Sequence, residues 1–292
     1  MEINHQASAE SLLQETNCLI TLPEVCMKLR QTLDDPNHTR QEISDVIVHD
    51  PSLTARLLRI VNSAYFGLST PVTCISHALG ILGEQDLNNL VIVTSIVKTM
   101  NSINTELDRN AFWRSSIFAA IVSRNIAATC QSNLKEELFI AGLLLNIGQF
   151  LIYYREPELL EAVEKEKSNS NRSDFSVEKE FLGFSHADVG SAMARNWNFS
   201  ELLIRSISSH HEIEEIDSNC LAGKITYLAA RCCERINFKT QQDTDINELE
   251  ADLQELLEKL DFKFKPKQFS EILHNSFDDY IEAYEDFCGA KA

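Results

Sequence analysis

DPSLTARLLRIVNSAYFG, residues 50–67, is the stretch that most clearly indicates the fold. Asp50 offers a side-chain acceptor at an N-cap, and Pro51 suits the first helical position, where no N–H is needed. Gly67 is placed to end the helix. Between them the apolar residues recur at helical spacing, namely Leu53, Leu57, Leu58 and Val61. The sequence therefore predicts a short amphipathic helix here.

Helical periodicity continues through most of the chain. Thr39 and Glu42 have the spacing of a capping box, and the apolar residues at 136–153 predict one central buried helix. Polar residues predict a surface loop at 167–173 and a hinge at 241–247. We find no strand-like alternation and no internal repeat, so the predicted fold class is all-α. Further helices are expected at 75–82, 84–100, 108–129, 176–182, 186–196, 201–211 and 218–236, and two more after residue 247.

The composition limits what the protein can bind. Its 292 residues suffice for one large domain or two small ones. Lys and Arg number 26 against 44 Asp and Glu, a formal charge of −18, so binding to nucleic acid or anionic lipid is not expected. Half of that charge lies in residues 241–292, with 14 acids and 5 bases.

Cysteine use and hydropathy indicate the compartment. The eight cysteines have no zinc-site spacing, and the N-terminus lacks the basic start and apolar core of a signal peptide. The longest apolar run, 139–154, is interrupted by Asn146, Gly148 and Gln149 and is judged too short to cross a bilayer. We expect a cytoplasmic protein with reduced thiols and no membrane anchor.

Three segments resemble the HDOD family, bacterial signalling proteins related to HD-type phosphohydrolases. They are Leu22-Pro23 with residues 50–67; FWRSS at 112–116 followed by AGLLLNIG at 141–148; and HADVG at 186–190 followed by Trp197 and ISSHHE at 207–212. They cover residues 15–235 in the family's order and spacing. The matching signature positions are Asp50, Pro51, Asn62, Ser63, Gly67, Trp113, Gly142 and Gly148.

The resemblance implies a two-lobed helical bundle. We expect a polar segment at 1–14, an N-terminal helical lobe at 15–106, an HD-like helical lobe at 107–238 and an acidic helical extension at 239–292. The extension is expected to cap the domain, because its aromatic residues need burial. The alternative is a docking element for a partner helix. Its aromatic residues are Phe262, Phe264, Phe269 and Phe277.

The metal ligands that the resemblance implies are missing from this sequence. In working HD enzymes a His, a His-Asp pair and a later Asp bind metal, which activates a water. Their imidazole and carboxylate atoms must converge within about 2.0–2.2 Å of the ion. Here Ser115 stands at the first His, Leu145 and Asn146 replace the pair, and Ala230 replaces the last Asp. We expect no catalysis by that route, no metal and no cofactor.

Three histidines remain at positions that help to hold a second ion in related enzymes: His186, His210 and His211. One interpretation is a residual metal or ligand site completed by Asp188 or Glu212. The favoured interpretation is that they are hydrogen-bonded packing residues or lie near a helix end, because no aspartate remains to balance the ions.

His49-Asp50 is a literal His-Asp dipeptide, but the N-cap role explains Asp50. Asn62 and Ser63 are expected to satisfy backbone groups where the helix ends. Other motifs also receive structural interpretations rather than chemical ones, because no nucleophile elbow or orienting acid accompanies the serines. They are Ser185, Ser209, the Phe112-Trp113 pair, expected between the lobes, and the Cys232-Cys233 pair, expected in a helix.

The leading functional hypothesis is a non-catalytic signalling module that acts through a protein partner. The resemblance links it to a family often associated with cyclic-dinucleotide control, motility or adaptation. The second hypothesis is a phosphohydrolase with a rearranged metal site around the three histidines. The third is a small-molecule sensor, because an emptied active site tends to stay concave.

Overall fold

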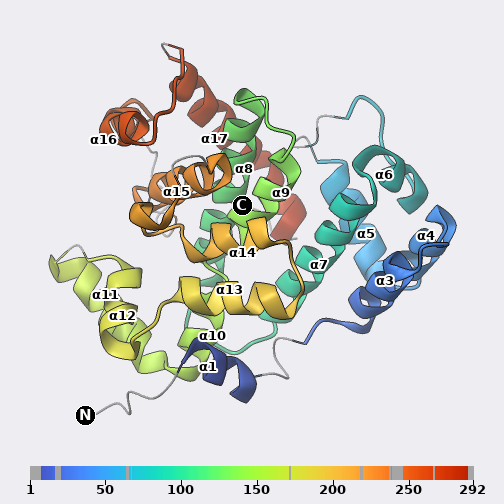
Figure 1. The fold of residues 1–292 in the computed structure, drawn as a ribbon, viewed down its shortest axis with the longest axis horizontal. Coiled ribbons are helices and arrows are strands. Elements are labelled where there is room, and N and C mark those ends of the chain that lie inside the picture. Colours follow the sequence, from blue (N-terminus) through green and yellow to red (C-terminus); the bar gives the residue numbers. More distant parts are fainter. Residues whose placement is uncertain are drawn as a thin grey trace. The chain divides into compact units, whose positions relative to one another are not determined.

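In the computed structural model every regular element among the described residues is a helix, so the all-α prediction is confirmed (Figure 1). The structure describes residues 8–16, 21–63, 66, 68–170, 172–217, 220–236, 238, 246–265 and 267–288. The chain divides into a small unit, Thr21–Ser102 with Phe277–Ala292, and a large unit, Met1–Ile20 with Ile103–Ser276. The expected boundaries at 106 and 239 differ from these, since residues 239–276 belong to the large unit.

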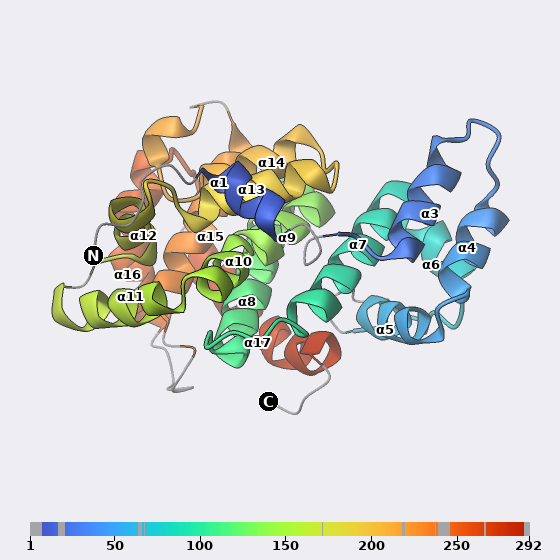
Figure 2. The ribbon, with the colours of Figure 1, turned by 90° about the horizontal axis from the view of Figure 1, so that it is seen from below.

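The small unit is built around a central helix. Its helices are α3 (Glu24–Asp34), α4 (Arg40–Val48), α5 (Pro51–Val61), α6 (Ile75–Leu82) and α7 (Glu84–Met100). Helices α3, α5 and α6 each pack on α7, and α4 packs on α3, α5 and α6 (Figure 2). Every residue from 89 to 97 is buried, so α7 supplies much of the core of this unit.

Side-chain caps fix where two of these helices begin. The Thr39 N–H donates to Glu42 Oε2 at 2.7 Å, and the Glu42 N–H donates to Thr39 Oγ1 at 3.3 Å. Asp50 Oδ1 accepts the N–H groups of Ser52 and Leu53, each at 3.0 Å. Both satisfy donors that the first helical turn leaves without partners. The predicted capping box and N-cap are therefore confirmed.

Asn62 and Ser63 end α5 in the way the sequence indicates. The Asn62 side-chain amide donates to Leu58 O and Val72 O and accepts from the Val72 N–H, at 2.6–2.8 Å. The Ser63 hydroxyl donates to Ile60 O at 2.7 Å. These bonds tie the end of α5 to the segment before α6. The predicted helix stop at Gly67 lies outside the described residues.

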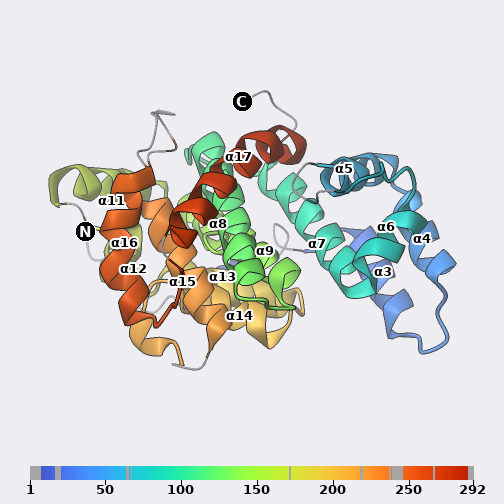
Figure 3. The ribbon, with the colours of Figure 1, turned by 90° about the horizontal axis from the view of Figure 1, so that it is seen from above.

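The large unit is organised around α8 (Arg109–Thr129), which packs on α9 (Lys135–Leu144) and α15 (Leu221–Glu234) (Figure 3). A second group centres on α13 (His186–Asn196), which contacts α10 (Gly148–Arg155), α14 (Glu201–Ser208), α12 (Asp174–Leu182) and α1 (Ala9–Glu15). Helix α11 (Pro157–Ser170) packs on α10 and α12, and α16 (Ile246–Lys259) packs on α15. The last helix is α17 (Gln268–Cys288).

The single helix predicted at 136–153 is wrong, because the chain turns at residues 145–147 between α9 and α10. The turn is tightened by i→i+3 bonds, such as Ile147 N–H to Leu144 O at 3.1 Å. A Cβ on Gly148 would lie 2.2 Å from His186 O, so glycine lets α10 approach α13. Gly142 likewise lets α9 approach α8, where a Cβ would lie 2.6 Å from Ala119 O.

Other local expectations need correction. Residues 167–170, predicted as part of a loop, are the last turn of α11. Helices α1, α3 and α11 were not predicted, and α1 occupies part of the supposed polar segment. In α1 the hydroxyls of Ser8 and Ser11 each accept the other's backbone N–H, so a capping box lies within that polar sequence. Of the hinge predicted at 241–247, residues 241–245 lie outside the described residues.

Length and composition alone would allow Lys135–Arg155 to cross a membrane, contrary to the sequence expectation. Its most apolar window has a mean hydropathy of 1.4, and 83% of that window is buried inside the protein. The core helices of soluble proteins meet the same two criteria, so this segment is weak evidence for a membrane span.

The acidic extension partly follows the capping interpretation. Helix α16 buries Leu249, Leu253 and Leu257 and packs on α15. Phe269 is buried, whereas Phe262, Phe264 and Phe277 are half-buried. The rings of Phe262 and Phe264 stack on each other with centroids 5.1 Å apart, and Phe264 stacks on Phe269. The aromatic residues thus cover one another as well as the helices beneath.

Candidate functional site

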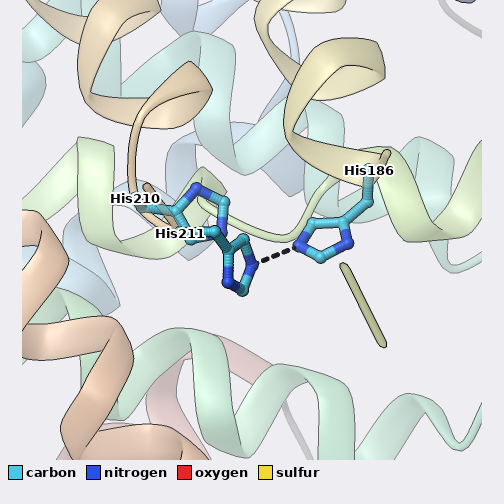
Figure 4. A group of neighbouring side chains, drawn as sticks. All are labelled: His186, His210 and His211. Carbon is cyan, nitrogen blue, oxygen red and sulfur yellow. Dashed lines mark hydrogen bonds between the residues drawn. The ribbon is translucent and has the colours of Figure 1, made fainter. Parts of the chain in front are cut away.

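His186, His210 and His211 come together in the large unit. His186 opens α13, and the other two follow the end of α14 (Figure 4). One ring nitrogen of each lies within 4.8 Å of the others. The figure shows the His211 ring between the other two, joined to His186 by a hydrogen bond. His186 and His210 are buried and His211 is half-buried. The sequence-based grouping of these residues therefore corresponds to a real cluster.

His186 is held by a buried carboxylate. Glu178, on α12, accepts the backbone N–H of His186 at 2.7 Å and its Nδ1 hydrogen at 2.6 Å, both on Oε2. The Tyr153 hydroxyl donates to Glu178 Oε1 at 2.7 Å. Three donors thus converge on a carboxylate that has no exposed surface. This network fixes the His186 ring and leaves Nε2 facing the other two histidines.

In the Glu178–His186 pair, the attraction between opposite charges outweighs the effect of burial on both pKa values. Burial by itself would raise the pKa of Glu178, but the His186 ring and the donated hydrogen bonds outweigh it and lower that pKa. Burial would likewise lower the pKa of His186, but the negative charge of Glu178 prevails and raises it. Burial, together with the Glu178 charge, raises the pKa of Tyr153 well above its ordinary value. Tyr153 is therefore a donor to Glu178.

His211 lies between His186 and a fixed positive charge. Its Nε2 is 2.9 Å from His186 Nε2, and the Arg231 guanidinium donates to its Nδ1 at 2.8 Å. Arg231 is also paired with Glu234 at 2.6 Å. The His211 imidazole also stacks on the Phe175 ring, with centroids 4.6 Å apart. Burial first, then the neighbouring histidines and Arg231, lower the pKa of His211 well below its ordinary value.

His210 contacts one of the positions expected to be vestigial. Its Nδ1 lies 2.6 Å from Ile207 O, and its Nε2 lies 3.3 Å from Asn146 Oδ1. Burial, followed by the charge of His186, lowers the pKa of His210 well below its ordinary value, so the ring is neutral. A neutral ring that donates through Nδ1 has a bare Nε2, so a hydrogen bond at this contact requires the Asn146 amide to be turned with its NH₂ toward the ring.

The four expected vestigial positions lie on α8, on α15 and in the turn between α9 and α10. Asn146 reaches His210, whereas Leu145 is buried at the end of α9 and Ala230 is buried in α15. Ser115 lies on α8, and its carbonyl accepts a bond from the Cys233 thiol at 3.5 Å. Among the described residues at these four positions, only Asn146 makes a side-chain hydrogen bond to a cluster histidine.

The two acids named for a rearranged metal site are engaged elsewhere. Asp188 Oδ2 accepts the N–H and the hydroxyl of Ser185, at 2.8 and 2.9 Å, and so caps α13. Glu212 is paired with Lys179 at 3.0 Å. No carboxylate joins the three histidines in the group that could hold an ion within the described part of the chain.

Sequence reasoning missed Glu178, Tyr153 and Arg231. Glu178 lies eight residues before His186 within an ordinary amphipathic helix, where an acid is expected to face solvent. Arg231 and Glu234 have the i,i+3 spacing of a helix ion pair, which was the one available signal. Neither pattern shows that the side chains point at histidines.

The structural interpretations of the other motifs agree with the contacts. His49 Nδ1 lies 2.5 Å from Asp45 O, at the end of α4 in the small unit. The Ser209 hydroxyl donates to Arg205 O at 2.8 Å. Cys232 and Cys233 are buried helix residues, and burial raises the pKa of Cys232 to about 12. These thiols are therefore poorly suited to redox chemistry.

Phe112 and Trp113 form part of the core of the large unit. The Phe112 ring meets those of Trp113 and Phe150 edge to face, with centroids 5.0 and 4.5 Å apart. All three residues are buried. The Trp113 signature position therefore has a packing role that the structure accounts for, as do Gly142 and Gly148.

The sequence pattern of the HDOD domain matches residues 19–213. The chain belongs to the HDOD family. Among curated proteins, an uncharacterized protein of Treponema pallidum (strain Nichols) is 26% identical over 216 residues. The match covers 73% of this chain and 42% of the relative, so this chain spans less than half of that protein.

Two solved structures share the fold over nearly the whole chain. A candidate phosphohydrolase from Shewanella amazonensis SB2B has a TM-score of 0.76 at 24% identity, covering 98% of this chain and 100% of its own. An HDOD domain protein of unknown function from Geobacter sulfurreducens has a TM-score of 0.72 at 23% identity, with coverages of 95% and 97%. At such identities the likeness to these HDOD-type structures establishes the fold alone.

Proposed function

We propose that this chain is a non-catalytic regulatory module of signal transduction that acts by binding another protein. Membership of the HDOD family supports a place in the HD superfamily. A candidate signal transduction protein from Marinobacter aquaeolei VT8 shares the fold, with a TM-score of 0.64 at 17% identity. The proposal depends chiefly on one feature of the candidate site, the contact between Asn146 and His210.

Asn146 stands where the resemblance to HD enzymes calls for an aspartate. A neutral amide cannot supply the negative charge that binds and bridges metal ions. It instead completes the hydrogen bonding of His210, whose Nε2 is the atom that would otherwise face an ion. The residue at this position thus serves the packing of the cluster.

The charges around the histidines also disfavour a cation. The Arg231 guanidinium is 2.8 Å from His211 Nδ1 and carries a permanent positive charge. Glu178 touches His186 on the side away from the other rings, and Glu234 is paired with Arg231. Three imidazoles beside a guanidinium, with the pKa of the His186 ring raised, therefore form a poor donor set for the divalent ions of phosphohydrolases.

The second candidate function is a phosphohydrolase with a rearranged metal site, and one observation favours it. The Nε2 atoms of His186 and His211 are 2.9 Å apart, close to the spacing of two ligands about 2.1 Å from one ion and at right angles. A buried acid orienting a histidine, as Glu178 does for His186, is also common behind metal ligands.

Elemental analysis of tag-free full chain, before and after incubation with Mn²⁺, Fe²⁺ or Zn²⁺, distinguishes the two functions. We expect sub-stoichiometric metal throughout and no hydrolysis of a phosphodiester such as bis(4-nitrophenyl) phosphate. The proposal fails if the wild-type chain holds one or two ions and hydrolyses the diester, and if His210→Ala loses both the metal and the hydrolysis. The matched control is His49→Ala, whose histidine lies in the small unit.

A further inference from the structure

The acidic charge of the chain is distributed unevenly. Residues 21–102 hold six Lys and Arg against eight Asp and Glu, a net charge of −2 out of −18 for the whole chain. Residues 103–240 are similarly close to neutral, with 15 bases against 19 acids, whereas residues 1–20 and 241–292 hold net charges of −3 and −9. A low net charge at residues 21–102 leaves an acidic partner little long-range repulsion there.

A small pocket lies within the small unit, where the start of α3, the start of α5 and the second half of α7 meet. Its cavity volume is about 30 Å³. That is room for about two water molecules, or for one small polar group such as a carboxylate. The lining combines apolar and basic side chains: Pro23, Val25, Leu53, Arg56 and Lys98.

The basic side chains of this pocket are unpaired. Arg56 is half-buried and Lys98 is exposed, and in the described part of the chain neither makes a hydrogen bond or an ion pair. Lys98 acts on Asp50 only at a distance: the hydrogen bond from the Leu53 N–H is the largest cause that lowers the pKa of Asp50, and the Lys98 charge is a smaller one. Two cations and one carboxylate, Asp50, thus line the pocket.

Other polar groups that line the pocket are already used. Asp50 Oδ1 accepts the first N–H groups of α5 and the Ser52 hydroxyl. The Thr94 hydroxyl donates to Leu90 O at 2.7 Å. The N-terminus of α5 is therefore closed to an outside anion. The charged donors that remain for a ligand are Arg56 and Lys98.

We propose that this pocket binds a glutamate or aspartate side chain from an acidic segment of the protein partner, a role that rests on the proposed function. A carboxylate matches the Arg56 guanidinium with two parallel hydrogen bonds. The methylene groups of the acidic side chain contact Pro23, Val25 and Leu53. A phosphate group fits less well, because its additional oxygens require donors that Asp50 already occupies.

A capped hexaglutamate peptide, titrated at low salt into the ¹⁵N-labelled full chain, tests the proposal. We expect amide shifts confined to residues 23–26, 50–56 and 94–98. The variant Arg56→Ala should raise the Kd about tenfold or more, which is about 1.4 kcal/mol of binding free energy. The control Arg59→Ala removes the same charge from the same helix outside the pocket and should change the Kd less than about twofold.

Any of three results would contradict the proposed ligand. They are no amide shift with hexaglutamate, equally weakened peptide binding in Arg56→Ala and Arg59→Ala, or equal amide shifts with capped hexaglutamine. Each of these contradicts the proposed ligand and says nothing about metal or hydrolysis. Conversely, metal-dependent hydrolysis in the earlier experiment would contradict the regulatory role whatever the peptide does. The two failures are therefore distinguishable.

Discussion

The Nε2 atoms of His186 and His211 lie 2.9 Å apart and share one hydrogen. Glu178 requires a hydrogen on His186 Nδ1, and Arg231 requires His211 Nδ1 to be bare. When both rings are neutral, the shared hydrogen therefore lies on His211 Nε2, and His186 Nε2 accepts it. A proton added to His186 would set two N–H groups against each other and break the contact.

The hydrogen bonds that converge on Glu178 should stabilise the large unit. Glu178→Gln keeps the shape but removes the charge that the Tyr153 hydroxyl and the His186 N–H groups require. We expect the free energy of unfolding to fall by about 1–3 kcal/mol. Urea denaturation at pH 7 measures it. The control Glu180→Gln, whose side chain is 60% exposed on the same helix, should cost under about 1 kcal/mol. Equal losses would contradict the role given to Glu178.

Acid should destabilise the fold through the cluster. His210 and His211 have pKa values well below the ordinary value, so below about pH 6.5 the unfolded chain takes up protons that the folded chain refuses. The raised pKa of His186 acts above this range: its contribution to stability is fully present below about pH 6.5 and is lost only as the pH rises through the raised value. Stability should thus fall between pH 6.5 and 5, by up to about 1.4 kcal/mol per pH unit for each of the two rings.

The variant His211→Gln should reduce this slope by the share of one ring. His274→Gln, on the exposed side of α17, is the control and should follow the wild type. Urea midpoints at pH 7, 6 and 5 give the comparison. A slope that His211→Gln leaves unchanged would show that the acid sensitivity arises elsewhere.

A charge at position 146 should alter His210. In Asn146→Asp a carboxylate replaces the amide 3.3 Å from His210 Nε2, so the pKa of His210 should rise toward its ordinary value or above it. Titration of the ring signals by NMR measures the shift. Asn146→Leu, without charge, should not raise it. If the aspartate leaves the pKa of His210 unchanged, the contact drawn between these residues is not made in solution.

Two glycines in helices make a matched pair. Gly148→Ala would place a Cβ 2.2 Å from His186 O and 2.8 Å from Gly190 N, both of them backbone atoms. We expect a loss of about 3 kcal/mol or more. Gly80→Ala meets no atom within 4 Å in α6 and should stabilise the protein by about 0.4–1 kcal/mol. Thermal unfolding of both variants would contradict this if Gly148→Ala were the milder change.

The sequence predicted helices best where a local signal begins them. Asp50 and Thr39 cap helices through side chains within three residues, so no tertiary information was needed. The break after Leu144 was missed because its cause is distant: α10 turns to lie against the backbone of α13. The apolar pattern at 136–153 is the same with or without that turn.

Much of the candidate site likewise could not be predicted from the spacing of residues in the sequence. The histidines were identified through the family resemblance, and the structure brings them together. Glu178 and Arg231 could not be recognised, because the sequence of an amphipathic helix does not show whether a charged side chain is buried or exposed. What distinguishes them is packing between α12, α13 and α15, which no local pattern records.

The close approach at Gly148 also determines which part of the histidine cluster can respond to a signal. His186 is anchored at its backbone by α10 and at its ring by Glu178, so it has little freedom to swing. His211 lies instead on the short connection after α14, held by side chains alone. A stimulus that reaches the cluster would therefore move the 209–212 segment, while α13 stays in place.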